Sequence, residues 1–372
     1  MKAHVIVFAV ALALLLLSCG KEEWKPGKPL EKEKVKIGVV HMTDPFSEDS
    51  GYSYAHEMGI QEMKRTLGLK DKQVLHRIHV GDADSQSAEN AMRECIAQGA
   101  NIIFATSWGY MDSCEKLARE FPSVVFAHAS GYKYNDLNFT NYFGRIYQAR
   151  YLSGIVAGMR TKSGKVGYVA AMGKDNSEVT SGINAFALGV EKVNPQARVH
   201  VKVTNIWFDP MGEAAAARTL IAAGCDVIAQ HCDSSTPQVE AEKAGVWGIG
   251  YNSDMIHEAP RAVLCSVLWH WGVYYTALVR SVMDGSFSTA PWFGSLKDGI
   301  VALSPLNPKM DWDAQTLNVL DEERRRIESG AFHVFGGILE SNDGRRIGKE
   351  GEKLADEEIR SGINWYYRNI VE

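Results

Sequence analysis

The sequence predicts an α/β protein with two doubly wound, parallel-sheet lobes joined by a hinge. The first observation is an internal repeat with an offset of about 130 residues, which indicates two copies of one architecture. Four segments recur in the same order: 36–40 as 165–169, 59–63 as 189–193, 96–103 as 221–228, and 124–126 as 246–248. The second observation is that each copy alternates β-branched apolar runs with amphipathic segments. This alternation is typical of strands joined by right-handed helical crossovers.

Each copy also carries local signals for its elements. Apolar residues between 88 and 96 fall on one helical face, and Gly99 can end that helix in the left-handed conformation. In the second copy, Pro210 can open the equivalent helix and Gly224 can close it. The run 101–105 is continuously apolar, as expected for a parallel strand that is covered on both faces.

Later segments are expected to complete both lobes by crossing between them. The sequence predicts strands at 264–268 and 297–303 and helices at 272–283 and 311–330. A chain of this length exceeds one ordinary domain. We therefore expect lobe 1 at 35–145 with about 264–292, lobe 2 at 146–263 with about 293–340, and a C-terminal extension at 341–372.

The first residues resemble an export signal with a lipid-attachment site. Lys2 precedes an apolar run at 5–17, and Leu-Leu-Ser then leads into Cys19. A membrane-spanning helix is the alternative, but this run gives roughly 20 Å of helix, less than the ~30 Å hydrocarbon core. We expect a signal peptide at 1–19 and a charged, flexible tether at 20–34. An acylated Cys19 would anchor the chain in the cell envelope, facing the periplasm or the cell exterior.

Composition argues against several classes of function. The net charge is −5 without a basic stripe, which argues against a nucleic-acid partner. No cysteine pair has CxxC spacing, which argues against a structural zinc site. No later stretch is long and apolar enough to span a membrane. We expect a monomer without a metal or cofactor.

The candidate ligand site lies at the strand ends. Ligands of open α/β sheets bind outside the carboxyl ends of the strands, and two lobes facing each other there form a cleft that can close by a hinge motion. The residues after the predicted strands are aromatic and polar. The candidate ligand-binding residues are Phe46, Asp49, Tyr52, Ser107, Trp108, Tyr110, Trp207, Asp233, Asp254 and Trp269. Aromatic faces can stack on a flat ring, and carboxylates can accept hydrogen bonds from its N–H groups.

Each of these residue types has a simpler alternative role. An aromatic residue after a strand can pack only against its own lobe. Asp209 can act only as a helix N-cap before Pro210, and Asp112 can cap the helix that follows Tyr110. The sequence leaves these alternatives open.

Several of these segments resemble one protein family. The residues that carry the resemblance are 106–112, 207–210, 230–234, 253–255, 335–338 and 342–344. They are similar to the basic membrane protein (BMP) family of lipoprotein substrate-binding proteins, which serve ABC importers of purine nucleosides and related compounds. The resemblance implies a type I periplasmic-binding-protein-like fold, a receptor rather than an enzyme, and an ABC permease and ATPase as partners.

The resemblance also implies a ligand and its stackers. Tyr52 and Trp207 match aromatic positions that stack on a purine, and Asp49 and Asp254 match polar positions. In nucleoside-binding members a lysine helps to hold the ribose, and its position here is Trp269. This departure favours a free purine base or a similar flat heterocycle, with a nucleoside or riboflavin as the alternative.

Two other classes of function compete with this interpretation. A periplasmic nucleoside-processing enzyme would need a catalytic constellation, but no GxSxG or HExxH motif is present and we assign no catalytic residue. The adjacent His231, Cys232 and Asp233 form a weak metal motif, because three neighbours rarely converge on one ion. A ligand-sensing surface lipoprotein without a transporter is the third hypothesis.

Overall fold

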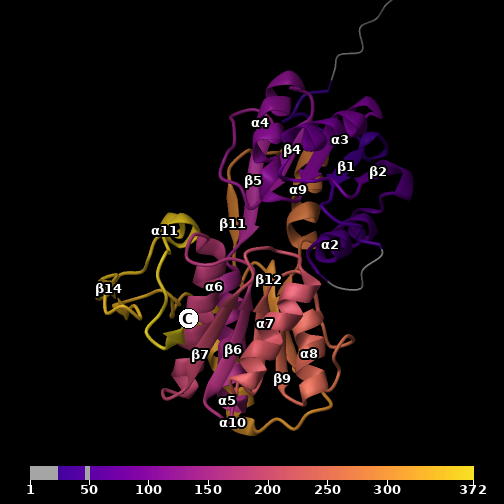
Figure 1. The fold of residues 1–372 in the computed structure, drawn as a ribbon. Coiled ribbons are helices and arrows are strands. Elements are labelled where there is room, and N and C mark those ends of the chain that lie inside the picture. The colour runs from indigo at the N-terminus through magenta and orange to yellow at the C-terminus, as the bar shows by residue number, and fades with distance from the viewer. Residues whose placement is uncertain (1–23, 47–50) are drawn as a thin grey trace, which may run out of the picture.

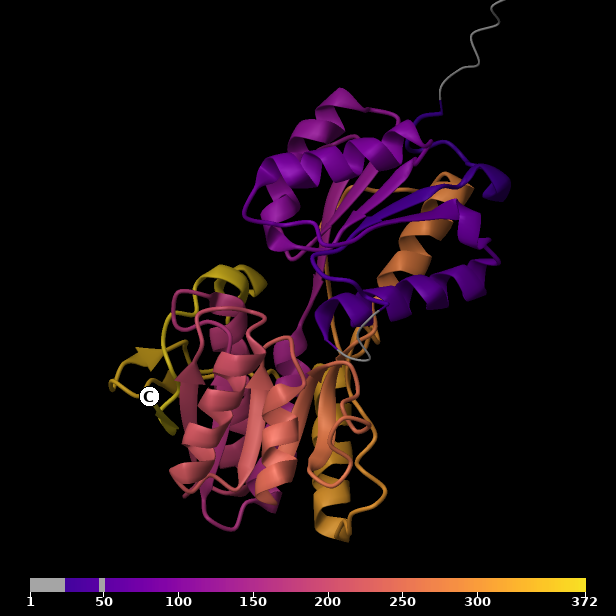
Figure 2. The ribbon, with the colours of Figure 1, turned by 45° about the vertical axis from the view of Figure 1, so that its right-hand side comes forward.

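A computed structural model describes residues 24–46 and 51–372 as two α/β lobes, one above the other in Figure 1. The predicted signal peptide, Cys19 and Asp49 lie outside the described residues. Figure 2 shows that each lobe is a twisted sheet with helices on both faces. This architecture confirms the predicted fold class.

Lobe 1 contains one sheet, and all of its described strand pairs are parallel. Its strand order is β11 (Trp292–Gly294), β5 (Phe139–Gly144), β4 (Val125–Ala129), β3 (Ile102–Ala105), β1 (Ile37–Val40) and β2 (Val74–Arg77). Helices α2 (Tyr52–Leu67) and α9 (Gly272–Asp284) pack together, and α3 (Ser85–Ala97) packs with α4 (Met111–Glu120). The two pairs cover opposite faces of the sheet (Figure 2).

Lobe 2 repeats this order. Its strands run β12 (Val301–Leu303), β10 (Val263–Trp269), β9 (Trp247–Asn252), β8 (Val227–His231), β6 (Lys165–Ala170), β7 (Arg198–Val203) and β15 (Ile370–Val371). Only the β10–β12 pair is antiparallel among the described pairs of this sheet. The helices are α5 (Ile146–Arg160), α6 (Ser177–Val193), α7 (Pro210–Ala222), α8 (Thr236–Ala244) and α10 (Ala314–Glu328).

The common strand order confirms the internal repeat. The first repeated segment forms β1 in lobe 1 and β6 in lobe 2, and the third leads into β3 and β8. Gly99 and Gly224 follow equivalent helices with φ of 90° and 92°. Both therefore adopt the left-handed conformation that the sequence predicted for these positions.

The chain crosses between the lobes three times within the described residues: from β5 to α5, from β10 to α9, and from β11 to β12. The expectation that 264–292 belongs to lobe 1 is wrong at its start, because β10 pairs with β9 in lobe 2. An apolar strand pattern does not specify which sheet the strand joins. Gly144 lies at the first crossing, where a Cβ atom would approach the Trp269 ring to 2.7 Å.

The described part of the predicted tether is packed rather than free. Leu30 is buried, and its backbone N–H donates to the carbonyls of Val282 and Met283 at the end of α9, each at 3.2 Å. A short 3-10 helix, η1 (Lys32–Lys34), then leads into β1. The flexible-tether prediction therefore fails at Leu30, because this one apolar side chain finds a site on lobe 1.

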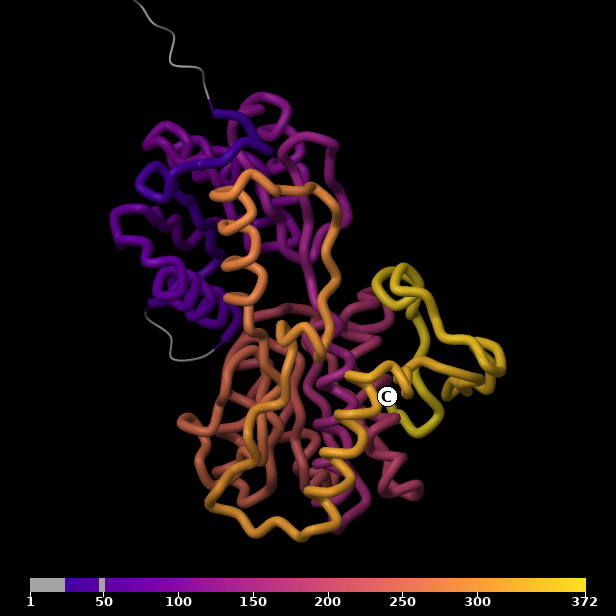
Figure 3. Tube along the Cα trace, turned by 180° about the vertical axis from the view of Figure 1, so that it is seen from behind, coloured from indigo at the N-terminus to yellow at the C-terminus, as the bar shows by residue number. Residues whose placement is uncertain are grey.

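The C-terminal extension lies along one side of lobe 2 (Figure 3). A hairpin of β13 (Leu339–Glu340) and β14 (Arg346–Ile347) spans the predicted start of the extension, which continues with helix α11 (Asp356–Ser361) and edge strand β15. The extension buries Trp365 and Tyr366, and α11 packs on α6. Among the described helices, none has the length and apolar character to cross a membrane.

Candidate ligand-binding cleft

The strand ends of the two lobes meet at a pair of adjoining cavities. One has a volume of about 460 Å³ and the other about 70 Å³. The residues that line both are Trp108, Ser130, Phe143, Glu178 and Trp207. In each sheet the first strand lies between the second and the third, so the topological switch point falls at this cleft, where such sheets bind ligands.

Two aromatic side chains reach the smaller cavity from opposite lobes. Tyr52 is the first residue of α2 in lobe 1, and Trp207 lies in the loop between β7 and α7 of lobe 2. The His56 ring meets Tyr52 edge-on at a centroid distance of 4.5 Å, and His231 does the same for Trp207 at 6.0 Å. This edge-on packing holds each of the two cleft rings at a steep angle to its histidine neighbour.

Hydrogen bonds hold the polar groups of the smaller cavity in place. The Ser107 hydroxyl donates to Asp82 at 2.6 Å on lobe 1. On lobe 2, the Asn252 amide donates to Asp233 at 2.9 Å. The Asp233 N–H also donates to the carbonyl of Trp207 at 2.8 Å, which joins the two ligand-facing loops of that lobe. These carboxylates are oriented before any ligand arrives.

Glu178 is a cleft residue that the sequence analysis missed. It lies in the first turn of α6 and lines both cavities with 25 % of its side chain exposed. Burial raises the pKa of Glu178 to about 7, although the Arg150 guanidinium acts in the opposite direction. At neutral pH this carboxyl can therefore donate or accept a hydrogen bond. The strands β1 and β6 are equivalent in the repeat, and each is followed by a helix, α2 or α6. Since Tyr52 begins α2, the repeat marks the start of α6, where Glu178 lies, as the equivalent place for a cleft residue.

A buried cation lies behind this wall of lobe 2. Arg150 is fully buried on α5, and its guanidinium lies 4.0 Å from the centroid of the Tyr251 ring. One nitrogen donates to the carbonyl of Gln230 at 2.6 Å, whereas Nε and Nη2 have no hydrogen-bond partner among the described residues. His231 is also buried. Burial is the main reason that its pKa lies well below the usual range, and the positive charge of the nearby Arg150 lowers it further. Lobe 2 thus places a fixed positive charge and a neutral imidazole beneath the cleft.

The structure brings half of the predicted site residues into the cavities. These are Tyr52, Ser107, Trp108, Trp207 and Asp233.

Phe46 and Tyr110 lie elsewhere in lobe 1. Phe46 is 59 % exposed and packs edge-on against His76 at 5.1 Å. Tyr110 is fully buried, and its hydroxyl donates to the carbonyl of Val80 at 2.6 Å. Each follows a strand as predicted, but neither ring is part of the cleft lining.

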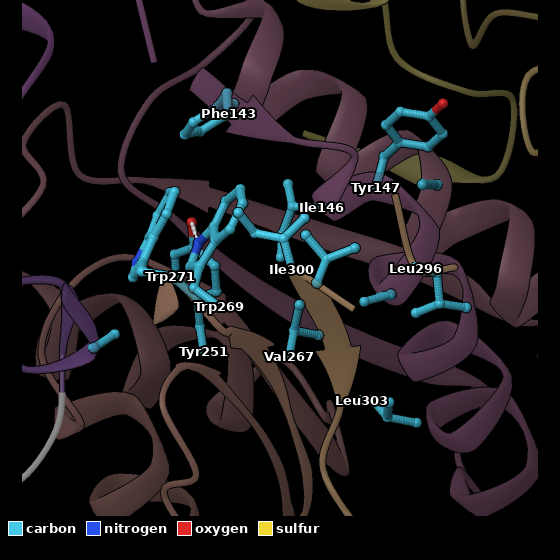
Figure 4. Packing of buried hydrophobic residues seen from close by; sticks show 14 of the residues in the cluster. Phe143, Ile146, Tyr147, Tyr251, Val267, Trp269, Trp271, Leu296, Ile300 and Leu303 are labelled. Carbon is cyan, nitrogen blue, oxygen red and sulfur yellow. Dashed lines mark hydrogen bonds between the residues drawn. The ribbon is translucent and has the colours of Figure 1, made fainter. Parts of the chain in front are cut away.

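Asp254 and Trp269 also lie outside the cavity linings. Asp254 accepts hydrogen bonds from the Ser266 hydroxyl and from the N–H of Ile256, both at 3.3 Å, at the turn after β9. Trp269 is buried at the hinge, stacked on Trp271 at a centroid distance of 4.4 Å (Figure 4). Its indole N–H donates to the hydroxyl of Tyr251 at 3.2 Å. Trp269 therefore packs within the hinge region and is absent from both cavity linings.

The C-terminal extension supplies a second group of residues that the sequence analysis missed. Ile359, Arg360 and Ser361 of α11 line the larger cavity. Arg360 donates to the carbonyl of Gly131 on lobe 1 at 2.6 Å and so bridges the lobes. No local signal places this helix at the cleft, because it reaches the cleft only through its packing on lobe 2.

The sequence matches an established family over most of its length. The profile described as "ABC transporter substrate-binding protein PnrA-like" (Bmp) matches residues 34–330. A purine-binding protein of Brucella abortus is 37 % identical over 340 residues, which cover 91 % of this chain and 93 % of that protein. A putative ABC transporter glucose-binding protein of Haloferax volcanii is 34 % identical, over 84 % of this chain and 76 % of that protein.

Solved structures share the fold at low sequence identity. A solute-binding protein of an ABC transporter system from Aeropyrum pernix has a TM-score of 0.67 at 17 % identity, covering 80 % of this chain and 92 % of that one. One from Conexibacter woesei has a TM-score of 0.66 at 20 % identity, covering 80 % and 98 %. These structures confirm the type I periplasmic-binding-protein fold. Together with the profile match, the identities show that this chain belongs to the Bmp family of PnrA-like ABC transporter substrate-binding proteins, which are receptors and not enzymes.

Proposed function

We propose that this protein is the extracytoplasmic receptor of an ABC importer and that it captures a purine base between the Tyr52 and Trp207 rings. One observation carries the proposal: a single cavity is lined by aromatic rings from both lobes and by three carboxyl groups. The carboxyl groups are those of Asp82, Glu178 and Asp233. Ring faces suit a flat heterocycle, and carboxyl oxygens suit its N–H edge. The purine-binding relative supports this choice.

Glu178 gives the site a group that can adapt to a purine edge. Purines present N–H donors beside ring-nitrogen acceptors, and a carboxyl with a pKa of about 7 can complement both. A site that hydrogen-bonds a ligand rejects analogues that leave its polar groups unpaired. Selectivity among bases would therefore depend on Glu178 more than on the aromatic rings.

A nucleoside is the second candidate. The cavity of about 460 Å³ opens directly from the smaller one and is lined by Asp175, Asn176 and Ser177, which could bond sugar hydroxyls. Trp269, at the position of the lysine in nucleoside-binding members, is buried at the hinge and lines neither cavity. A base remains our first choice, since no lysine lines either cavity among the described residues.

The N-terminal segment completes the proposal. Acylation of Cys19 would hold the receptor at the membrane, where it would act as a monomer and deliver its ligand to an ABC permease and ATPase. Mass spectrometry of the mature N-terminus from membranes should show a lipid-modified cysteine. An unmodified or uncleaved N-terminus would contradict the anchor.

The ligand itself can be identified directly. Small molecules released from the purified, denatured protein should include a purine by mass spectrometry. Calorimetry on refolded, ligand-free protein should then rank adenine, guanine and hypoxanthine above their nucleosides. Glucose and riboflavin serve as comparison ligands, because a glucose-binding protein is among the relatives. Tighter binding of glucose than of every purine would overturn the proposal.

A further inference from the structure

Lobe 1 contains a compact group of two histidines and one glutamate outside the cleft lining. His41 directly follows β1, Glu57 lies on α2, and His76 lies in β2. One side-chain nitrogen or oxygen from each residue lies within 4.8 Å of those of the other two. The Glu57 carboxylate oxygen Oε2 is 2.9 Å from His76 Nε2 and 3.8 Å from His41 Nε2. Three elements of the lobe therefore converge on one point.

His41 makes this group more than a buried ion pair. The pair of Glu57 and His76 satisfies both of its members, but His41 is 0 % exposed and neither ring nitrogen has a hydrogen-bond partner among the described residues. A buried polar atom without a partner is rare in folded proteins, and a bound ion is one of its ordinary explanations. Imidazole nitrogens are among the commonest metal ligands in proteins, so the unpartnered nitrogens of His41 can take this role.

The distances suit a tetrahedral transition-metal site. Zinc bonds to histidine nitrogen and carboxylate oxygen at about 2.0–2.2 Å, which separates neighbouring ligand atoms by roughly 3.3 Å. The two separations from Glu57, 2.9 Å and 3.8 Å, lie on either side of that value, and the two histidine nitrogens lie within 4.8 Å of each other. Small side-chain rotations would bring all three ligands onto one ion. Two imidazoles and one carboxylate are a ligand set used by zinc when a fourth position stays open to water.

The surroundings also resemble the outer shell of a metal site. The second oxygen of Glu57, Oε1, accepts a hydrogen bond from Gln61 at 2.5 Å, which fixes the orientation of the carboxylate. The Phe46 ring packs edge-on against His76 at a centroid distance of 5.1 Å. His76 itself keeps 21 % of its side chain exposed, which leaves a path from solvent.

We propose that His41, Glu57 and His76 bind one divalent transition-metal ion of the zinc class. The ion would cross-link β1, β2 and α2 and leave its fourth position to water. Since Tyr52 begins α2 less than two turns before Glu57, the ion would also fix the helix that carries the cleft tyrosine. The sequence could not show this site, because the ligands are far apart along the chain and form no spaced motif.

Metal titration of the full chain tests the proposal. After treatment with EDTA and removal of the chelator, calorimetry with Zn²⁺ should show one site per chain. Co²⁺ in place of Zn²⁺ should give the visible absorption of a tetrahedral site with nitrogen and oxygen ligands. His76→Gln and Glu57→Gln should each weaken Zn²⁺ binding by at least about 100-fold, since loss of even an outer-shell partner costs 10–100-fold.

Two controls keep the test decisive. His257→Gln removes an exposed histidine of lobe 2 and should leave Zn²⁺ binding unchanged. Circular dichroism should show that the partly exposed His76 can be replaced without unfolding. Zn²⁺ binding that is absent from the unaltered chain, or equal in the unaltered chain and the folded His76→Gln variant, would overturn the proposal. Because the readout is metal and not purine, its outcome is independent of the proposed ligand.

Discussion

The two lobes present different walls to one cleft. The lobe 1 wall consists mainly of aromatic rings and hydroxyls, from Tyr52, Trp108, Ser107 and Ser130, and the Ser107 hydroxyl is already bonded to Asp82. The lobe 2 wall also holds an aromatic, Trp207, but it adds the carboxyl groups of Glu178 and Asp233. Behind that wall lies the buried guanidinium of Arg150, two of whose nitrogens have no hydrogen-bond partner among the described residues.

The difference teaches how a duplicated fold can divide one task. Both lobes offer strand ends and helix starts at equivalent places, so shape alone does not distinguish them. Lobe 1 is a preformed platform, whereas lobe 2 places the pH-sensitive Glu178 above a buried positive charge. Platforms contribute affinity, and polar groups that must be satisfied contribute specificity.

The largest expected effect tests whether the lobe 1 platform depends on a neutral histidine. His128 is fully buried and bonds the carbonyl of Ser107 at 2.7 Å, and burial lowers its pKa to about 4. Between pH 6.5 and 4 the unfolded chain binds the proton and the folded chain does not, so stability is full above pH 6.5 and falls with acid. The loss amounts to roughly 3 kcal/mol at most.

Urea unfolding at pH 7.5 and 4.5 measures this loss. The His128→Gln variant retains a donor for Ser107 and should lose less stability over the same interval than the unaltered chain. An equal loss of unfolding free energy in both proteins would show that His128 is not the cause of the acid sensitivity.

The second effect compares the two stacking rings. Trp207→Ala and Tyr52→Ala should each weaken binding of the identified purine by about 1–3 kcal/mol, or roughly 5- to 150-fold. If both rings hold one ligand, the double variant should show coupling between them. Trp312→Ala is the matched control, because this indole packs on lobe 2 outside the cavities. Calorimetry that finds full affinity without Trp207 would remove it from the site.

A smaller effect distinguishes the contribution of the Glu178 carboxyl group from that of the aromatic rings. The protonated form of Glu178 declines as pH rises through about 7. If that form donates to the base, affinity for adenine should be about tenfold weaker at pH 8 than at pH 6, since the protonated fraction falls by that factor. Glu178→Gln, which donates at every pH, should bind with little dependence on pH. Tighter binding at pH 8 would mean that the carboxylate is the recognised form.

The smallest effect concerns the bridge that joins the walls. Arg360→Ala removes the bond from α11 to Gly131 and should weaken ligand binding about two- to fivefold, because a single hydrogen bond contributes roughly 1 kcal/mol. Arg368→Ala is the control, since this arginine of the same extension pairs with Glu191 away from the cleft. Identical affinities for the two variants would confine the extension to a structural role on lobe 2.

The sequence predicted the scaffold better than the site. The repeat and the helix-ending glycines depend on local pattern, so Gly99, Gly224 and the two similar α/β lobes agree with the structure. The direction in which a side chain points after the end of a strand does not depend on the local sequence pattern alone. Tyr110 and Trp269 occupy the predicted positions in the chain, yet the first turns into the core of lobe 1 and the second into the hinge.

The sequence by itself determined the two-lobed fold, the family and the edge of the sheets at which a ligand would bind. Hydrophobic periodicity and duplication are properties of neighbouring residues and can be read along the chain. Only the tertiary structure decided that Glu178 and Arg360 reach the cleft, that Leu30 packs on lobe 1, and that His41 and His76 meet Glu57. Those contacts join residues from different helices, strands and loops. Whether each side chain is buried or reaches the cleft depends on how these elements pack together.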